Sequence, residues 1–376
     1  MSDSWSLSSR SKTSSDYIFL QLQRLKTEIE QKQQVKVLDL SAGVPKFPPS
    51  KINKLKLQEL ASETEVYYYP SYKPVPEFVS AVLNWYKKRF GVKKELFVQI
   101  GHGAKDILTH LPYIFTDEDD EVLVPNPGYP GFVSSFKFLG IRPVFYNLSE
   151  ETNFSLDLEK IKQSVSKKTK AIIVNFPSNP TGQVADKFQL QQLVDFCRET
   201  GIVLVYDNAY SEIYFSKFVP PSIFECQGAE QIAVEIGSVS KTFSLAGIRL
   251  GFIVGNEKFI SAFSSMKSAF DTGVFTAVQR VAAYAYDNFD YNWYEQMILK
   301  YKENIIKTAN ILSSLGLKFE FPKAGLYFWA KIPDAYESSD KFVVDVLEKK
   351  YILLAPGSAF GSLGTRYIRA SFCALP

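Results

Sequence analysis

Lys241 and Arg249 are the two side chains of this sequence that most directly suggest chemistry. They lie in the segment SVSKTFSLAGIRLGF (238–252), where small and hydroxyl residues surround the lysine. A lysine amine held away from bulk water can be deprotonated and form a Schiff base with an aldehyde. An arginine offers a fixed fork of donors that suits a phosphate. Pyridoxal 5′-phosphate (PLP) carries both an aldehyde and a phosphate, so the segment makes it the candidate cofactor.

Asp207 is a second polar residue in an unusual place, because it directly follows the hydrophobic run 202–206. A carboxylate at the buried end of a strand is costly unless a cation or hydrogen-bond donors satisfy it. Asp207 could cap a helix, or it could pair with the ring nitrogen of a pyridine and keep that nitrogen protonated. Tyr210, three residues later, could hydrogen-bond the phenolic oxygen of the same ring.

Three turns carry further candidate groups, although each alone is also compatible with an ordinary loop. In NPTG (179–182), the proline restricts the backbone, so the Asn179 amide could be held toward a ligand oxygen. In GHGA (101–104), backbone N–H groups at the start of a helix could bind a phosphate. In PNPGYPGF (125–132), Tyr129 lies between prolines and could stack on a planar ring.

Most of these groups lie at the ends of short apolar runs typical of strands. The runs are rich in β-branched residues and mostly continuous, as in strands buried on both faces; they are 96–101, 121–127, 142–148, 170–177, 201–208, 233–240 and 251–255. Because helical stretches separate them, we predict an α/β domain whose mainly parallel sheet is sandwiched by helices. Ligands of such sheets bind beyond the carboxyl ends of the strands.

The rest of the chain predicts a smaller α+β domain. We expect a helix over 17–34, a strand within 37–45, one long helical stretch over 275–315, a helix over 339–349, and strands at 317–322, 326–332 and 367–372. The predicted organisation is an N-terminal segment that packs with the small domain (1–45), a large PLP-binding domain (46–280), and an interdomain helix with the small C-terminal domain (281–376).

Composition excludes several classes of function. The net charge of +3 gives no indication of a nucleic-acid surface, and no apolar run reaches the roughly 20 residues that span a bilayer. Cys197, Cys226 and Cys373 are far apart and lack CxxC spacing, which argues against a zinc site or a disulfide framework. With only His102 and His110 as histidines, we expect no metal, and the free thiols fit a reducing, cytoplasmic compartment.

The order and content of these motifs resemble the fold type I, class I/II PLP-dependent aminotransferases, the aspartate aminotransferase family. The resemblance extends from SAGVP (41–45) to YIRASF (367–372), and its strongest motifs are NPTG (179–182), YDNAY (206–210) and SKTFSLAGIRLG (240–251). It implies an enzyme that moves an amino group from an L-amino acid to a 2-oxo acid, with 2-oxoglutarate as the expected acceptor, in a ping-pong scheme. It also implies a homodimer.

The resemblance assigns roles around the cofactor. Lys241 matches the Schiff-base lysine that also moves the substrate's α-proton, Asp207 matches the partner of the ring nitrogen, and Asn179 and Tyr210 match the donors to the phenolic oxygen. The remaining matches are the phosphate ligands Ser238 and Arg249, with Ala104 and Lys105 beside them, the ring-stacking Tyr129, and Tyr69, which matches the tyrosine that reaches the partner's phosphate across a dimer.

For the substrate, Arg369 matches the arginine that grips the α-carboxylate, with Gly43 and Asn179 beside it. The GAK turn with Lys105 is similar to that of prokaryotic aspartate and LL-diaminopimelate aminotransferases, which favours aspartate or another polar, dicarboxylic amino acid. The many tyrosines leave an aromatic substrate open. Pro74 and Val79 depart from the family pattern in the loop and helix start that follow Tyr69.

Two other functions on this scaffold remain to be separated from transamination. A carbon–sulfur β-lyase, or a related enzyme such as an aminocyclopropane-carboxylate synthase, would carry the same catalytic residues. A PLP-binding sensor fused to a DNA-binding domain would need a winged helix of some 70 residues, and only about 35 precede Val37. The serine-rich first 15 residues fit either a frayed start or a transit peptide.

Overall fold

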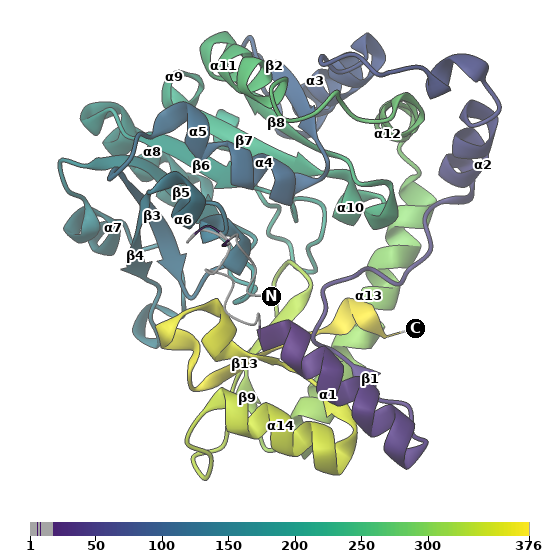
Figure 1. Ribbon diagram of the computed structural model, residues 1–376, viewed down its shortest axis with the longest axis vertical. Coiled ribbons are helices and arrows are strands. Elements are labelled where there is room, and N and C mark those ends of the chain that lie inside the picture. Colours follow the sequence, from purple (N-terminus) through teal and green to yellow (C-terminus); the bar gives the residue numbers. More distant parts are fainter. Residues whose placement is uncertain (1–5, 7, 9–17, 376) are drawn as a thin grey trace.

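The computed structural model describes residues 6, 8 and 18–375, so the first 15 residues lie almost wholly outside the described part (Figure 1). Its largest element is a seven-stranded sheet with the order β2-β8-β7-β6-β5-β3-β4. The strands are β2 (Phe97–Gly101), β3 (Glu121–Asn126), β4 (Arg142–Asn147), β5 (Thr169–Asn175), β6 (Val203–Asp207), β7 (Ala233–Ser238) and β8 (Gly251–Gly255). All neighbours are parallel except β8, which is antiparallel to β2 and β7. The seven predicted strands and the mainly parallel sheet are confirmed.

Helices cover both faces of this sheet, as the continuous apolar runs predict. One face packs against α3 (Pro76–Phe90), α8 (Lys187–Thr200) and α12 (Thr276–Asp287), and the other against α4 (Ala104–His110) and α11 (Glu257–Lys267). Local sequence fixes several ends: Pro76 opens α3, Gly91 closes it in the left-handed conformation, and Asp186 with Gln189 forms a capping box on α8.

A four-stranded sheet lies below the large one, and α13 runs down the right-hand side of the view from beside α12 to the small sheet (Figure 1). Its order is β12-β13-β10-β9, from β9 (Lys318–Phe319), β10 (Tyr327–Lys331), β12 (Ala355–Pro356) and β13 (Tyr367–Ser371). The N-terminal region joins this part, because β1 (Leu38–Asp39) pairs with β11 (Ile352–Leu353) and α1 (Ile18–Gln33) lies beside α14 (Ser339–Lys350). The domain boundaries at 45/46 and 280/281 stay a prediction.

The single long helix predicted over 275–315 is wrong. The structure has α12, a break, and then α13 (Tyr291–Ser314). Asp290 ends the break by accepting a hydrogen bond from Trp293 N at 3.0 Å, as an aspartate at an N-cap does. Asn288 and Asp290, the polar residues on either side of Phe289, indicate this break in the sequence, but the helical periodicity before and after them conceals it.

The remaining helices are short connectors, apart from α2 (Lys51–Leu60). They are α5 (Pro112–Phe115), α6 (Phe136–Leu139), α7 (Leu158–Ser164), α9 (Ala229–Ile232) and α10 (Val239–Thr242). Among the described helices, we find none with the length and apolar character needed to cross a membrane.

Candidate active site

The carboxyl ends of three parallel strands define the candidate site. β5, β6 and β7 end on Asn175, Asp207 and Ser238, and because the strands are parallel these polar residues meet at one edge of the sheet. A cavity of about 330 Å³ opens there. Its lining includes eleven of the twelve predicted site residues: Gly43, Ala104, Lys105, Tyr129, Asn179, Asp207, Tyr210, Ser238, Lys241, Arg249 and Arg369.

Lys241 enters the cavity from α10, the short helix that directly follows β7. Ser238 caps this helix by accepting a hydrogen bond from Ser240 N at 3.2 Å. The Lys241 Nζ donates a hydrogen bond to Gly43 O at 2.6 Å. Burial lowers the pKa of the Lys241 amine, and the nearby Arg369 and Arg249 act in the same direction. The amine therefore loses its proton more readily than an exposed lysine, as Schiff-base chemistry requires.

Asp207 is a buried carboxylate with few hydrogen-bond donors around it. Among the residues that the structure describes, it accepts one hydrogen bond, from Ala209 N at 3.1 Å. Burial raises the pKa of this carboxyl to about 7. A protonated pyridine nitrogen is a donor and a positive charge at once, so the residues present fit PLP at this point of the cavity.

Arg369 brings the small sheet to the same cavity. Its Nη1 donates to Asn179 Oδ1 at 2.8 Å and its Nη2 to Ser41 O at 2.5 Å. The buried Nε has no hydrogen-bond partner among the described residues. Asn179 is itself fixed, because its N–H donates to Asn175 Oδ1 at 2.7 Å. A guanidinium held this way, with a donor left over, suits a carboxylate ligand.

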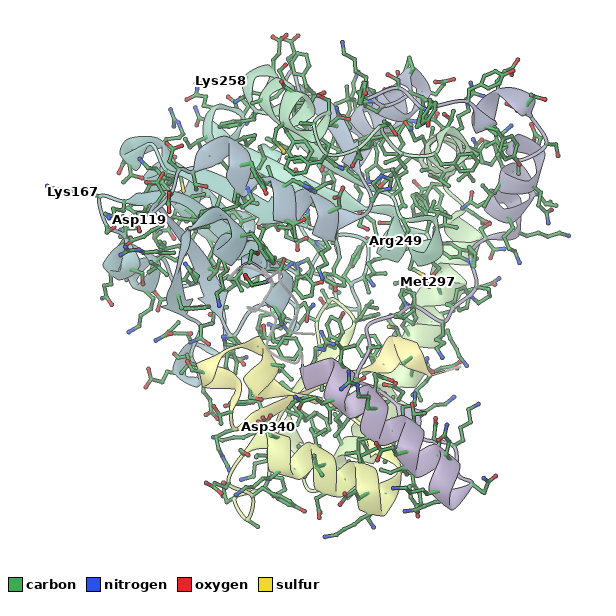
Figure 2. All side chains as sticks on the ribbon, viewed as in Figure 1. Asp119, Lys167, Arg249, Lys258, Met297 and Asp340 are labelled. Carbon is green, nitrogen blue, oxygen red and sulfur yellow. The ribbon has the colours of Figure 1, made fainter. Side chains whose placement is uncertain are left out.

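Arg249 and the 101–104 turn form the other end of the cavity. The Arg249 Nη1 donates to Ala246 O at 2.8 Å and its Nη2 to His102 O at 3.4 Å, beside α10 (Figure 2). Gly103 has a φ of +91°, and a Cβ there would lie 2.6 Å from Arg249 Nη2. The close approach of guanidinium and turn therefore requires glycine, and it places a fixed positive charge next to the start of α4.

Comparisons with known proteins agree with this geometry. A family model described as aminotransferase class I and II matches residues 35–376. The chain belongs to this family. It is 36% identical to the LL-diaminopimelate aminotransferase of Desulforudis audaxviator over 360 residues, which are 94% of this chain and 90% of that protein. It is a PLP-dependent aminotransferase, as the sequence predicts.

Solved structures of similar proteins share the fold over nearly the whole chain. Substrate-bound BacF from Bacillus subtilis superposes with a TM-score of 0.92 at 31% identity, covering 98% of this chain and 94% of BacF. An aromatic aminotransferase from Pyrococcus horikoshii OT3 superposes with a TM-score of 0.85 at 27% identity, covering 92% and 93%.

Tyr69 is the predicted site residue that the aminotransferase does not place in its own cavity. It is 89% exposed and lies with Tyr67, Tyr68 and Phe275 around a separate hollow of about 360 Å³. Its predicted contact with a partner's phosphate stays a prediction. Pro74 and Val79, which depart from the family pattern, lie outside the lining of the active-site cavity.

Sequence analysis missed a partly buried ionic cluster beside the 101–104 turn of the aminotransferase. Lys267 of α11 lies 3.0 Å from Asp106 Oδ2 and also contacts the Asp271 carboxylate. Asp106 in turn accepts a hydrogen bond from His102 N at 2.8 Å. Hydrogen bonds from His110, His102 N and Lys267 hold the Asp106 pKa well below its ordinary value, although burial acts in the opposite direction. Lys267 and Asp271 are four residues apart, as are Asp106 and His110, but no spacing in the sequence relates Lys267 to Asp106.

Tyr327 is a second residue that sequence analysis missed. It was predicted only as part of a strand, and it opens β10 with its side chain in the cavity lining. Its hydroxyl lies 3.0 Å from that of Tyr210. Strand alternation alone could not show which face of β10 meets the large sheet.

Proposed function

We propose that this aminotransferase takes the amino group of LL-diaminopimelate and passes it to a 2-oxo acid, with 2-oxoglutarate as the expected acceptor, in a ping-pong scheme. The observation that carries the proposal is that Lys105 lines the Lys241 cavity. Besides Lys241 and Arg249, which are assigned to the cofactor, the cavity therefore has two cationic side chains, Arg369 and Lys105. A substrate with a carboxylate at each end matches such a lining. The name of the relatives favours diaminopimelate over aspartate within the dicarboxylic class.

In this proposal the chain's own residues hold the cofactor and move one proton. Bound PLP supplies the electron sink that makes the substrate's α-proton removable. Asp207 keeps the ring nitrogen protonated, while Tyr210 and Asn179 donate to the phenolic oxygen. Lys241 would take the proton from the substrate's Cα and would return it to C4′ of the bound cofactor. Ser238, Arg249 and the backbone at Ala104 and Lys105 bind the phosphate, and Tyr129 stacks on the ring.

Substrate orientation falls to the small sheet and the N-terminal segment. Arg369 binds the α-carboxylate as a fork, with the Gly43 main chain and Asn179 beside it. The Lys105 ammonium binds the distal carboxylate. Because Arg369 sits on β13 and Lys241 on α10, the two parts of the chain must close on one substrate for the α-proton to reach Lys241.

The proposed active form is a homodimer. Tyr67, Tyr68 and Tyr69 are all more than 60% exposed, which is unusual for three consecutive aromatic residues. A second copy of the chain would cover them, and Tyr69 would reach the partner's phosphate.

An aromatic amino acid is the second candidate substrate. Tyr129, Tyr210 and Tyr327 line the cavity together with Val44 and Leu108, and one structural neighbour carries the name aromatic aminotransferase. These apolar walls would accept a ring where the first proposal places a distal carboxylate.

Replacement of Lys241 tests the centre of the proposal. Wild-type protein purified with PLP should absorb in the visible, and Lys241→Ala should lose both this band and transamination. Lys105→Ala is the matched control, because it also removes one lysine of the cavity and should keep the band. An unchanged visible spectrum in Lys241→Ala would refute the role of Lys241.

A substrate panel tests the choice of amino acid. The loss of the visible band on mixing should be followed for the twenty common amino acids and LL-diaminopimelate. We expect diaminopimelate to react best. Lys105→Ala should raise the KM for diaminopimelate about tenfold, because one charge-assisted hydrogen bond is lost, and should leave the KM for phenylalanine unchanged. Preference for phenylalanine or tyrosine in the wild type would favour the second candidate instead.

A further inference from the structure

We propose that Tyr327 is a positioning residue that connects the substrate-binding Arg369 to Tyr210, the donor to the cofactor's phenolic oxygen. The inference rests on the proposed roles of those two residues. The Tyr327 hydroxyl lies 3.0 Å from the Tyr210 hydroxyl, and the Arg369 guanidinium lies over the Tyr327 ring at 4.3 Å from its centroid. One side chain therefore contacts both residues.

The fold holds Tyr327 in this place from two sides. On the small sheet, Trp329 pairs with Arg369, and Tyr327 lies two residues before Trp329 on the same face of β10. On the opposite side, a Cβ at Gly43 would lie 1.9 Å from the Tyr327 hydroxyl oxygen. Gly43 is thus the residue that makes room for this hydroxyl, and its carbonyl accepts the hydrogen bond from Lys241.

The direction of the hydrogen bond follows from counting protons. A phenol has one O–H to donate and two lone pairs to accept. If the Tyr210 hydroxyl donates its hydrogen bond to the cofactor's phenolic oxygen, the contact at 3.0 Å requires the Tyr327 hydroxyl to donate to Tyr210 Oη. Burial raises the pKa of both hydroxyls, so both keep their protons through neutral pH. A donor that also accepts is polarised and donates more strongly.

Arg369 gives this relay a dependence on substrate. Its positive charge near the Tyr327 ring favours donation by the Tyr327 hydroxyl. Once a substrate carboxylate pairs with Arg369, part of that charge is neutralised, and the donation from Tyr327 through Tyr210 weakens. The phenolic oxygen then carries its negative charge less readily, so carboxylate binding favours protonation of the bound cofactor. Asp207 and Cys373 also face Tyr327 and stay unchanged in this step.

The test is a double-mutant cycle on the full-length protein loaded with PLP. The pH midpoint of the visible absorbance change is measured for wild type, Tyr327→Phe, Tyr210→Phe and the double variant. We expect Tyr327→Phe to raise the midpoint by about half a pH unit and Tyr210→Phe to raise it more. The double variant should match Tyr210→Phe, because the relay acts only through Tyr210.

Pimelate provides a second readout, since it has the two carboxylates of diaminopimelate and no amino group to react. It should raise the midpoint of the wild type and raise that of Tyr327→Phe by less. Tyr367→Phe is the matched control: it makes the same change on β13, where Tyr367 pairs with Lys331, away from Tyr210, and should leave the midpoint unchanged.

Three outcomes would overturn the relay. The first is that Tyr327→Phe leaves the pH midpoint unchanged. The second is that Tyr327→Phe shifts the midpoint as much in the Tyr210→Phe background as in the wild type. The third is that pimelate raises the midpoint equally in wild type and Tyr327→Phe. Failure of the proposed function gives a different result, because the wild type would then prefer another amino acid in the substrate panel while its visible band still titrates.

Discussion

Asp207 and Glu235 are buried carboxylates on adjacent strands, and burial raises the pKa of each to about 7. Their surroundings differ. Glu235 accepts hydrogen bonds from four donors, Ser222 Oγ at 2.6 Å, Ile223 N at 2.8 Å, Tyr86 Oη at 2.9 Å and Asn208 Nδ2 at 3.0 Å. Asp207 accepts one among the described residues, from Ala209 N, and faces the cavity.

The pairing of β6 with β7 places the two carboxylates on opposite faces of the sheet. Tyr206 pairs with Glu235 and Asp207 with Ile236, and paired residues share a face while neighbours alternate. Glu235 therefore points toward α3, where Tyr86 meets it, and Asp207 points the other way. A buried carboxylate that the protein itself satisfies is structural, whereas one left with few donors at a cavity indicates a ligand.

Asp207→Asn should give the largest effect. An amide cannot keep the ring nitrogen protonated, so we expect kcat with diaminopimelate to fall about 10³-fold, near the upper range for loss of one preorganised electrostatic contact. Glu235→Gln is the matched control on the adjacent strand, and its kcat per bound cofactor should stay within about threefold. Steady-state kinetics with the bound cofactor quantified would contradict the comparison if both variants lost activity equally.

Glu235→Ala should have the next largest effect, and on stability. Removal of this carboxylate leaves four buried donors unpaired, so the free energy of unfolding of the cofactor-free protein should drop by about 3 kcal/mol. Asp207→Ala should lower it by no more than about 1 kcal/mol, because only one donor is left. Urea unfolding of both variants decides the matter, and equal losses would remove the distinction between the carboxylates.

The pH dependence of stability should separate the same two residues. The ordinary pKa of an aspartate is 3.8, and Asp207 is raised to about 7 in the folded chain. Between these values the folded protein binds a proton that the unfolded chain does not, so stability falls as pH rises. From pH 5 to 7 the titration of Asp207 should lower the free energy of unfolding by about 2 kcal/mol, which is the Asp207 share of the decline.

Urea titrations at pH 5, 6 and 7 measure this decline. The cofactor-free Asp207→Asn variant should lack the Asp207 share and keep the similar contribution of Glu235. Bound PLP should suppress the Asp207 share in the wild type, because its ring nitrogen stabilises the ionised carboxylate. An identical pH slope in wild type and Asp207→Asn, both without PLP, would show that Asp207 titrates near its ordinary pKa.

Tyr86→Phe should give the smallest effect. It removes one of the four donors to Glu235 and leaves the other three, so we expect a loss of about 1 kcal/mol in unfolding free energy. The visible band and kcat should stay as in the wild type, since Tyr86 lies on the opposite face from the cavity. A spectral change in this variant would mean that the two faces are coupled.

Much of the site could be predicted because its groups sit next to strong local signals. Asp207 and Ser238 end hydrophobic runs, and parallel strands bring such ends together at one edge whatever lies between them in sequence. Asn179 and Arg249 belong to compact motifs. The break at 288–290 was missed for the opposite reason, since strong helical periodicity on both sides outweighed a short polar cap.

The sequence by itself determined the family, the cofactor and the order of the large sheet's strands along the chain, since these depend on local motifs and on runs buried on both faces. Only the tertiary structure decided which distant residues meet. The Gly43 carbonyl accepts a hydrogen bond from Lys241, 198 residues away, Lys267 pairs with Asp106 beside the 101–104 turn, and the Tyr327 hydroxyl contacts that of Tyr210. Such contacts depend on how helices and sheets pack in space, and side-chain spacing along the chain carries no record of that.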